Sequence, residues 1–213
     1  MTNGETNIGL EIIPVNGPYS NMPKSKTNKL FVSRAGEKVC FALEHFSLSI
    51  EQKVCADFGS STGGFVDCLL QKGAKKVYAV ETGYGVLDWK LRNDTRVVVM
   101  ERTNAMHVKL PEIVDFISID VSWTSLIKIL PNALINLRKG GEIVALLKTH
   151  YEITAKNPKA QASKISKSDA EKIKNEVLAD IKNLPVELKG VIESPLRGGK
   201  GGNIEYLVWM HKK

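Results

Sequence analysis

The chain has 213 residues, of which 43% are hydrophobic and 25% charged, and its formal net charge is +7 at pH 7. This length and apolar content predict a single domain with a sizeable core. A membrane-spanning helix is not expected, because no stretch reaches about 18 consecutive apolar residues. The positive charge favours a polyanionic partner, although it would serve general solubility equally well.

The three cysteines, Cys40, Cys55 and Cys68, fall in apolar strand or helix patterns and form no C-x-x-C pair. Such cysteines are typical of buried free thiols in a reducing compartment, so we expect no metal site. The first residues also lack the basic start and apolar run of a signal peptide. Together these features predict a cytoplasmic protein.

Residues 1–28 mix Gly, Asn, Pro, Ser and Lys without periodicity, which predicts a flexible basic N-terminal arm. Residues 29–213 are predicted to form one folded domain. It starts with a helix in SRAGEKVCFALEHF, where apolar residues recur at helical spacing and Ser33 is a candidate cap.

Apolar runs rich in β-branched residues then alternate with helical patterns. The expected strands occupy residues 53–59, 76–82, 96–103, 115–122 and 142–152. This alternation predicts an α/β fold with a mostly parallel sheet and helices on both faces. The last two expected strands, 187–196 and 203–213, have no helix between them, which predicts an antiparallel C-terminal strand at or near one edge of the sheet.

The loop after the first expected strand, DFGSSTGGF at residues 57–65, is rich in glycine. Gly59 and Gly64 have the spacing of a phosphate-binding P-loop, but Phe65 stands where that motif requires a lysine. The dinucleotide fingerprint G-x-G-x-x-G fails as well, because Ser61 occupies its second glycine position. The loop therefore lacks provision for phosphate groups.

What remains is an acid followed by small residues, Asp57, Gly59, Ser61 and Gly63, with Glu81 at the end of the next strand. A carboxylate at that place can accept both hydroxyls of a ribose. A glycine loop and a ribose acid without phosphate contacts fit S-adenosylmethionine, which joins adenosine to an amino acid. The alternative is that the glycines only make a tight turn between strand and helix.

Two charged residues end apolar runs: Asp120 in DFISIDVSW and Lys148 in EIVALLKTH. Ligands of open α/β sheets bind outside the carboxyl ends of the strands, and a charge at the end of a buried strand is costly unless it is paired or part of a site. Both are therefore candidate site residues. Lys38, early in the first helix, and Glu205, within GNIEYLVW, would be ordinary surface residues if they stood alone.

Several longer motifs make the chain similar to a known family. Across roughly residues 30–212 it contains, in this order, SRAGEK, DFGSSTGGFVDCLLQKGAKKVYAVETGYGVLDWKLRND, VVVMERTN, DFISIDVSWTSL, ALLKTHYE and GGNIEYLVW. With these motifs it resembles the TlyA-type proteins, which are FtsJ-like ribosomal RNA 2′-O-methyltransferases that also carry the label hemolysin. The resemblance implies a Rossmann-like, S-adenosylmethionine-dependent methyltransferase fold.

In FtsJ-like enzymes a Lys-Asp-Lys-Glu tetrad carries methyl transfer to a ribose 2′-hydroxyl, and the resemblance places it on Lys38, Asp120, Lys148 and Glu205. A ribose hydroxyl is a weak nucleophile that must lose its proton as it attacks the methyl group. Lys148 is the candidate for orienting this hydroxyl and accepting the proton, and the carboxylates are candidates for positioning the lysines. Which group takes the proton stays open from sequence.

The resemblance also implies which residues hold the cofactor. Asn104, after the third expected strand, is expected to reach the adenine edge, with a capping role as the alternative. The expected cofactor set is Asp57, Gly59, Ser61, Thr62, Gly63, Gly64, Phe65, Glu81, Asn104 and Asp120.

The sequence departs from the family in two places. Residues 1–28 are too short and too polar for the S4 RNA-binding domain that TlyA-type proteins usually carry. Residues 149–151 read Thr-His-Tyr where the family tends to have Pro-Gln-Phe. For His150 the alternatives are a proton acceptor, an RNA contact or a rim residue.

RNA binding would then depend on this domain itself. The candidates are the lysine-rich segment 155–168, the basic RGGKGG segment, and stacking on Tyr84, Trp123 or Tyr151. The alternatives are a solvated surface for the lysines and ordinary packing for the aromatic residues.

We therefore expect an enzyme that transfers a methyl group from S-adenosylmethionine to a ribose 2′-hydroxyl, with ribosomal RNA or a ribosomal subunit as its partner. The alternatives are a non-catalytic RNA-binding protein on a methyltransferase fold and a small-molecule methyltransferase. Membrane lysis, which the hemolysin label would suggest, has no transmembrane segment or strong amphipathic helix to support it. The oligomeric state and the target nucleotide stay open.

Overall fold

The computed structural model describes residues 30–156, 165–198 and 202–213. The predicted N-terminal arm and most of the lysine-rich segment lie outside the described residues. The strands are β1 (Val54–Phe58), β2 (Lys76–Val80), β3 (Val97–Met100), β4 (Val114–Ile119), β5 (Leu137–Lys148), β6 (Val186–Glu193) and β7 (Glu205–Lys212). The helices are α1 (Ala35–His45), α2 (Gly64–Gln71), α3 (Trp89–Arg92), α4 (Leu126–Asn136), α5 (Thr149–Lys156) and α6 (Lys167–Ile181).

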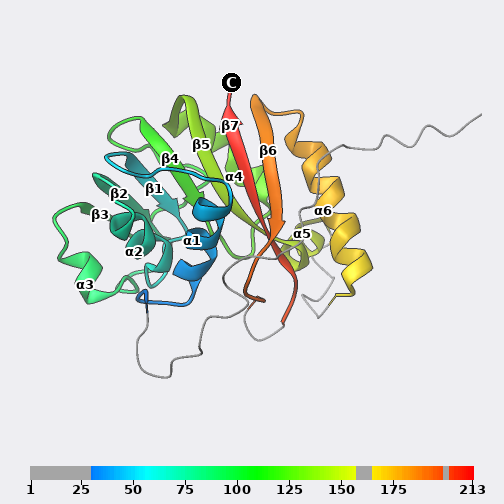
Figure 1. Cartoon of the computed structure of the whole chain (residues 1–213), viewed down its shortest axis with the longest axis horizontal. Coiled ribbons are helices and arrows are strands. Elements are labelled where there is room, and N and C mark those ends of the chain that lie inside the picture. The colour runs from blue at the N-terminus through cyan, green and yellow to red at the C-terminus, as the bar shows by residue number, and fades with distance from the viewer. Residues whose placement is uncertain (1–29, 157–164, 199–201) are drawn as a thin grey trace, which may run out of the picture.

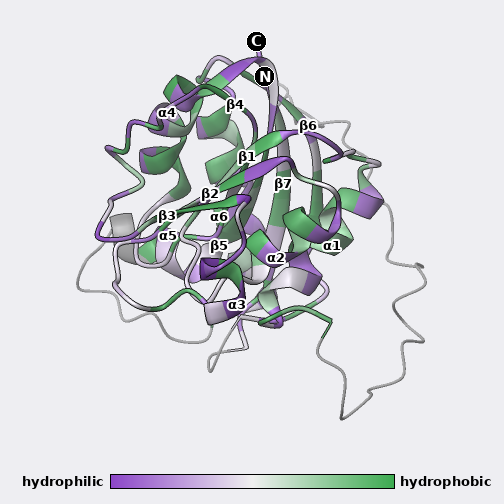
Figure 2. Ribbon diagram, turned by 90° about the vertical axis from the view of Figure 1, so that its left-hand side faces the viewer, coloured by the Kyte–Doolittle hydropathy of each residue, from purple (hydrophilic) through white to green (hydrophobic). Residues whose placement is uncertain are grey.

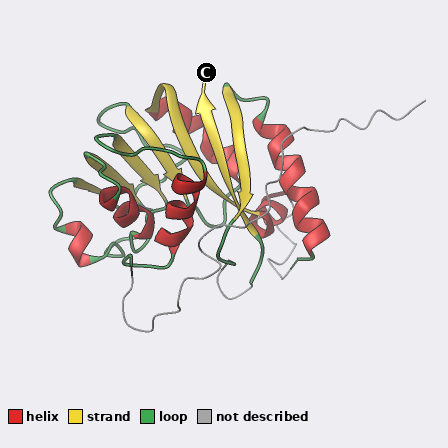
Figure 3. Cartoon of the chain, viewed as in Figure 1, coloured by secondary structure: helices red, strands yellow, loops and turns green. Residues whose placement is uncertain are grey.

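The seven strands form one sheet in the order β3-β2-β1-β4-β5-β7-β6 (Figures 1 and 3). β1 to β5 run parallel to one another, whereas β7 runs antiparallel to both β5 and β6. The predicted mixed α/β sheet is therefore confirmed. The predicted antiparallel pair lies at one edge of the sheet, where β7 inserts between β5 and the edge strand β6.

Helices cover both faces of the sheet, as the alternating pattern predicts. Side chains of α1, α2 and α3 form one apolar cluster with one face, and side chains of α4 and α6 form a second cluster with the other. In Figure 2 the hydrophobic colour concentrates on the strands and the sides of the helices that face them, and the hydrophilic colour on the outer loops. Among the described helices, none is long and apolar enough to cross a bilayer.

Two elements differ from the sequence prediction. β5 begins at Leu137, before the expected strand 142–152, because Leu137 pairs with Val114 of β4 before the register shifts. Residues 149–152, which were expected to continue this strand, instead begin helix α5. Ser33 does not cap α1, since the helix begins after Arg34 without a side-chain capping hydrogen bond.

The sheet brings the candidate site residues to one edge. Parallel strands have their carboxyl ends together, and Asp57, Glu81, Asp120 and Lys148 lie at or just beyond the ends of β1, β2, β4 and β5. Glu205 begins β7, and because β7 is antiparallel, its first residue lies at this same edge. These five residues thus meet at the edge where open α/β sheets bind ligands.

Candidate active site

The glycine loop between β1 and α2 has a backbone that glycine alone adopts easily. Gly59 and Gly63 have φ angles of +90° and +96°. A Cβ atom on Gly59 would lie 2.6 Å from the backbone oxygen of Asp120, and one on Gly63 would lie 2.2 Å from Leu91 Cδ1. The loop therefore needs glycine both for its conformation and for the close approach of its neighbours.

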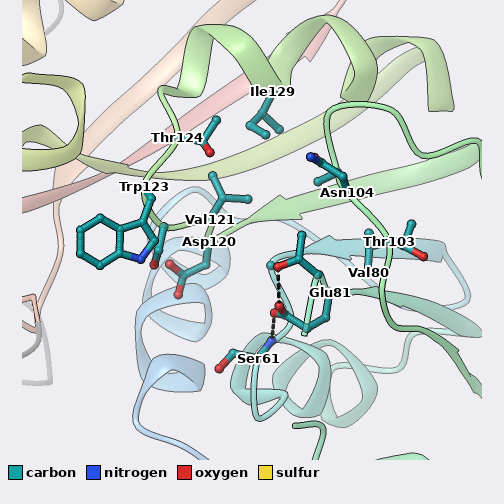
Figure 4. Close-up of a pocket in the computed structure, with 14 residues that line it drawn as sticks. Ser61, Val80, Glu81, Thr103, Asn104, Asp120, Val121, Trp123, Thr124 and Ile129 are labelled. Atoms are coloured by element: carbon teal, nitrogen blue, oxygen red, sulfur yellow. Dashed lines mark hydrogen bonds between the residues drawn. The ribbon is translucent and has the colours of Figure 1, made fainter. Parts of the chain in front are cut away.

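Two adjoining cavities open beside this loop. The larger has a volume of about 440 Å³ and lies beyond the ends of β2, β3 and β4, with Val80, Val121 and Ile129 among its apolar walls (Figure 4). The smaller has a volume of about 190 Å³ and lies between the loop and Lys148. Both are lined by Gly59, Ser61, Asp120 and Ser122, so the two cavities adjoin each other at these residues.

Glu81 lines the larger cavity and is held by its own neighbours. Its Oε2 accepts a hydrogen bond from the Ser61 N–H at 2.9 Å, and its Oε1 accepts one from the Gly83 N–H at 2.8 Å. Burial alone would raise the pKa of Glu81, but the N–H groups of Gly83 and Ser61 outweigh it and lower the pKa. An ionised, fixed carboxylate thus faces the place predicted for a ribose.

Asp57 lines the smaller cavity from beneath the loop. Its carboxyl is 1% exposed, and Oδ1 accepts a hydrogen bond from Ser118 Oγ at 2.7 Å. Oδ2 is buried and has no hydrogen-bond partner among the described residues. Burial raises the pKa of Asp57 to about 8, against the Ser118 hydrogen bond, and the charges of Asp120 and Glu81 add to the rise. Such a carboxyl is suited to a cationic ligand group.

The other residues predicted for the cofactor are divided between the cavities. Asn104 lines the larger one, and its Oδ1 also accepts a hydrogen bond from the Met106 N–H at 2.9 Å, so the capping alternative is realised as well. Thr62, Gly64 and Phe65 line the smaller one. Gly63 lines neither and serves as the left-handed residue before α2.

The four tetrad positions form two ion pairs that lie side by side. Lys148 Nζ is 2.5 Å from Asp120 Oδ1, and Lys38 Nζ is 2.5 Å from Glu205 Oε2. Lys148 and Glu205 are partners in the β5–β7 register. Three different parts of the sheet and the first helix therefore bring the four residues together.

The two pairs differ in access. Lys148 and Asp120 line the smaller cavity, whereas Lys38 and Glu205 line neither cavity. The Lys38 and Glu205 side chains are only 8% and 3% exposed. Gly198 packs against the same carboxylate, since a Cβ atom there would lie 2.5 Å from Glu205 Oε1. The Lys38–Glu205 pair thus lies in the protein interior, next to the accessible Lys148–Asp120 pair.

Sequence reasoning missed two serines. Ser118 fixes Asp57, and Ser122 Oγ lies 3.3 Å from Lys148 Nζ and lines both cavities. Their position in the run DFISIDVSW, on either side of Asp120, was the available signal. His150, the second residue of α5, is half-buried, and burial, followed by the charges of Lys148 and Lys38, lowers its pKa.

Aromatic side chains border the accessible lysine. The rings of Trp123 and Tyr151 are 4.9 Å apart, and Lys148 Nζ lies 5.7 Å from the centre of the Tyr151 ring. Trp123 is 74% exposed although it lines the larger cavity, and it has a left-handed φ of +64°. An exposed, strained aromatic residue beside a candidate catalytic group indicates a binding role.

Comparisons with known proteins agree with this geometry. Residues 31–212 match the family model of the FtsJ-like methyltransferases. The chain is 41% identical over 186 residues to YqxC of Bacillus subtilis, named as an rRNA methyltransferase, in a match covering 85% of this chain and 66% of YqxC. It is 36% identical over 196 residues to the 16S/23S rRNA (cytidine-2′-O)-methyltransferase TlyA of Mycobacterium tuberculosis, covering 86% of this chain and 69% of TlyA. The chain thus spans about two thirds of the length of these relatives.

Solved structures share the fold. A hemolysin-like protein from Streptococcus thermophilus superposes with a TM-score of 0.82 at 40% identity, covering 89% of this chain and 70% of that one. At 17% identity, fibrillarin from Aeropyrum pernix, solved with bound S-adenosylmethionine, still superposes with a TM-score of 0.55 over 76% of this chain and 68% of that one. The architecture is that of S-adenosylmethionine-dependent methyltransferases.

Proposed function

Since the chain belongs to the FtsJ-like methyltransferase family, we propose that it transfers a methyl group from S-adenosylmethionine to the 2′-hydroxyl of a ribose in ribosomal RNA. The observation that carries this proposal is the position of the Lys148–Asp120 ion pair beside two adjoining cavities that suit the two halves of the cofactor: Asp120 lines both, and Lys148 lines the smaller. TlyA of Mycobacterium tuberculosis is named for cytidine, and we propose a cytidine ribose as the acceptor here too.

The residues of the site fit S-adenosylmethionine. Its adenosine would occupy the larger cavity, with the ribose on Glu81 and the adenine between apolar walls near Asn104. Its amino-acid end would occupy the smaller cavity, where the unpartnered Oδ2 of Asp57 can accept a hydrogen bond from the ammonium group. Among the described residues that line the two cavities there is no arginine and Lys148 is the one lysine, which agrees with a cofactor that has no phosphate.

The tetrad has the chemistry that ribose methylation requires. When bound, S-adenosylmethionine supplies an electrophilic methyl group on a sulfonium. After its own extra proton has passed to solvent, the neutral amine of Lys148 would orient the ribose hydroxyl and accept its proton as the ribose oxygen takes the methyl group. Asp120 orients Lys148, and the Lys38–Glu205 pair fixes the strand beneath it.

The surroundings of Lys148 favour RNA over a small acceptor. Trp123 and Tyr151 give an aromatic surface on which a base can stack beside the reacting ribose. The site is open to the surface at Trp123, so a long acceptor can reach it. The net charge of +7 suits a polyanion.

The test uses tritiated S-adenosylmethionine with each purified ribosomal subunit and with extracted ribosomal RNA. The wild-type chain should label RNA in an alkali-resistant linkage, because 2′-O-methylation blocks cleavage of the next phosphodiester. Lys148→Ala should lose at least about 100-fold in rate while retaining cofactor affinity by calorimetry. Lys53→Ala is the matched control. Lys53 also forms an ion pair, with Glu142, but it lies just before β1, at the edge of the sheet opposite the site.

Two results would contradict the proposal. If RNA takes no label although the cofactor binds, the acceptor is a small molecule or the protein is a non-catalytic RNA binder. If Lys148→Ala labels RNA as fast as Lys53→Ala, the tetrad is not the catalytic group.

A further inference from the structure

Tyr84 and Arg102 form a stacked pair on the surface, called here the Tyr84–Arg102 platform. The Arg102 guanidinium carbon lies 4.4 Å from the centre of the Tyr84 ring. Tyr84 is nevertheless 71% exposed, and Arg102 is exposed as well. No carboxylate among the described residues forms an ion pair with Arg102. The platform thus presents an open aromatic face and an uncompensated cation.

The backbone holds this platform in a fixed place. The Arg102 N–H donates to the Gly83 oxygen at 3.1 Å, and the Gly85 N–H donates to Glu101 Oε1 at 2.9 Å. Arg102 has a φ of +52°, a conformation that costs energy for any residue except glycine. Strained backbone of this kind persists where the surrounding contacts determine it, and it concentrates at functional sites.

The platform borders the larger cavity on the side away from Trp123. Gly83 connects them, because its N–H donates to Glu81 and its oxygen accepts from Arg102. Thr103, the next residue, lines the cavity, and Figure 4 shows Thr103 and Glu81 on the opposite side from Trp123. Trp123 with Tyr151 thus lies on one side of the larger cavity, and Tyr84 with Arg102 lies next to residues on its other side.

We propose that the Tyr84–Arg102 platform binds a nucleotide of the RNA substrate next to the methylated one, by stacking a base on Tyr84 and pairing a phosphate with Arg102. The inference rests on the proposed function and adds a second contact that fixes the direction in which the strand crosses the site. With both aromatic groups occupied, the RNA would span the cavity mouth and close it over the bound cofactor.

RNA fits this surface better than the cofactor does. S-adenosylmethionine has no phosphate to pair with Arg102, and the proposed function already assigns its ribose to Glu81 in the larger cavity. Neither Tyr84 nor Arg102 lines either cavity. A base and a phosphate, in contrast, are what an aromatic ring and a guanidinium in contact recognise together.

The experiment compares the full-length wild type with Tyr84→Ala, Tyr84→Phe and Arg102→Ala. Filter binding to each purified ribosomal subunit gives the RNA affinity, and calorimetry gives the affinity for S-adenosylmethionine. Tyr84→Ala should weaken RNA binding about tenfold, whereas Tyr84→Phe should restore it because the ring is retained. Arg102→Ala should weaken RNA binding. It should also reduce the magnitude of the slope of log K for RNA against log salt concentration by about one, as expected for the loss of one phosphate contact. Cofactor affinity should be unchanged in all three.

The matched control is Arg138→Ala, an exposed arginine at the start of β5 and hence at the opposite edge of the sheet. It should bind RNA as the wild type does. Wild-type affinity in Tyr84→Ala and Arg102→Ala, with methylation intact, would overturn the platform and leave the proposed function standing. Loss of cofactor affinity equal to the loss of RNA affinity would assign the pair to the cofactor instead. Absence of RNA binding and methylation in the wild type would overturn both.

Discussion

Lys148 and Glu205 face each other as register partners in the antiparallel pair β5–β7, and each forms its ion pair with a different residue. Lys148 pairs with Asp120 and Glu205 with Lys38, so positive and negative groups alternate along a short row. The row places one pair at the cavity and the other in the protein interior. One pair is therefore accessible to a ligand and the other is not.

Breaking the buried pair should destabilise the protein strongly. Lys38→Met leaves the Glu205 carboxylate buried without its cation, which should cost about 3–5 kcal/mol in the free energy of unfolding. The double variant Lys38→Met/Glu205→Leu removes both charges and should recover most of that loss. Urea unfolding at pH 7 measures both.

The double variant also separates the two functions of the pair. It should remain a poor methyltransferase although it is stable, because Lys148 has lost the fixed charge opposite it. A double variant that is stable and fully active would show that Lys38 and Glu205 serve the fold alone.

Adding one methyl group at Gly198 should affect the reaction without affecting cofactor binding. The Cβ atom of Gly198→Ala would lie 2.5 Å from Glu205 Oε1, so the carboxylate or the loop must move. Small displacements of catalytic groups cost up to about 100-fold in rate, and we expect a loss of tenfold or more with unchanged cofactor affinity. Gly202→Ala controls for backbone strain in the same loop, because its φ of +61° makes alanine costly while no atom of the described residues lies within 4 Å of a Cβ there. Equal rates for the two variants would contradict the prediction.

Gly59 and Gly85 offer a matched comparison for the cofactor loop. Both have left-handed backbone, with φ angles of +90° and +69°, so alanine at either should cost about 1–2 kcal/mol of stability. Only at Gly59 would the new Cβ meet another group, the Asp120 oxygen at 2.6 Å. Gly59→Ala should therefore weaken S-adenosylmethionine binding about tenfold or more by calorimetry, and Gly85→Ala should not.

Asp57 should make folding stability depend on pH. Burial raises its pKa to about 8, so the folded chain keeps a proton that the unfolded chain releases above about pH 4. Between these values the folded state binds more protons, and the free energy of unfolding should fall as pH rises from about 4 to about 8 and then level off. Asp57→Asn, which stays neutral, should flatten this part of the stability curve measured by urea unfolding.

The same carboxyl should couple cofactor binding to proton release. An ammonium group beside Asp57 favours the carboxylate, so binding at pH 7 should release up to about one proton per cofactor. Calorimetry in buffers of different ionisation enthalpy measures that number. Release of the same number of protons by Asp57→Asn would assign the effect to another group.

Much of this arrangement was predictable because strand ends carry positional information. In a parallel sheet the residues after each strand must meet at one edge, which is why Asp57, Glu81, Asp120 and Lys148 could be grouped from their places in apolar runs. Glu205 could not be grouped in this way. It begins an antiparallel strand, and only its resemblance to a family motif indicated a shared site.

Contacts that depend on strand register, or on hydrogen bonds between the segments that follow two strands, could not be predicted from the sequence. Ser118 reaches Asp57 only because β4 pairs with β1 in one particular register. Arg102 meets Tyr84 because the segments after β2 and β3 are hydrogen-bonded to each other. A one-residue slip would move such side chains to the other face of the sheet, so sequence spacing alone does not determine them.

The placement of β7 between β5 and β6 sets an order of events during protein synthesis. β6 leaves the ribosome before β7, yet β7 is its one neighbour within the described sheet, so β6 cannot join until β7 has been made. Both cavities are lined by residues 33 to 148, whereas Glu205 comes later in the chain. The residues that line both cavities are therefore synthesised before the last strand, and the four tetrad positions are complete only when Glu205 has been added.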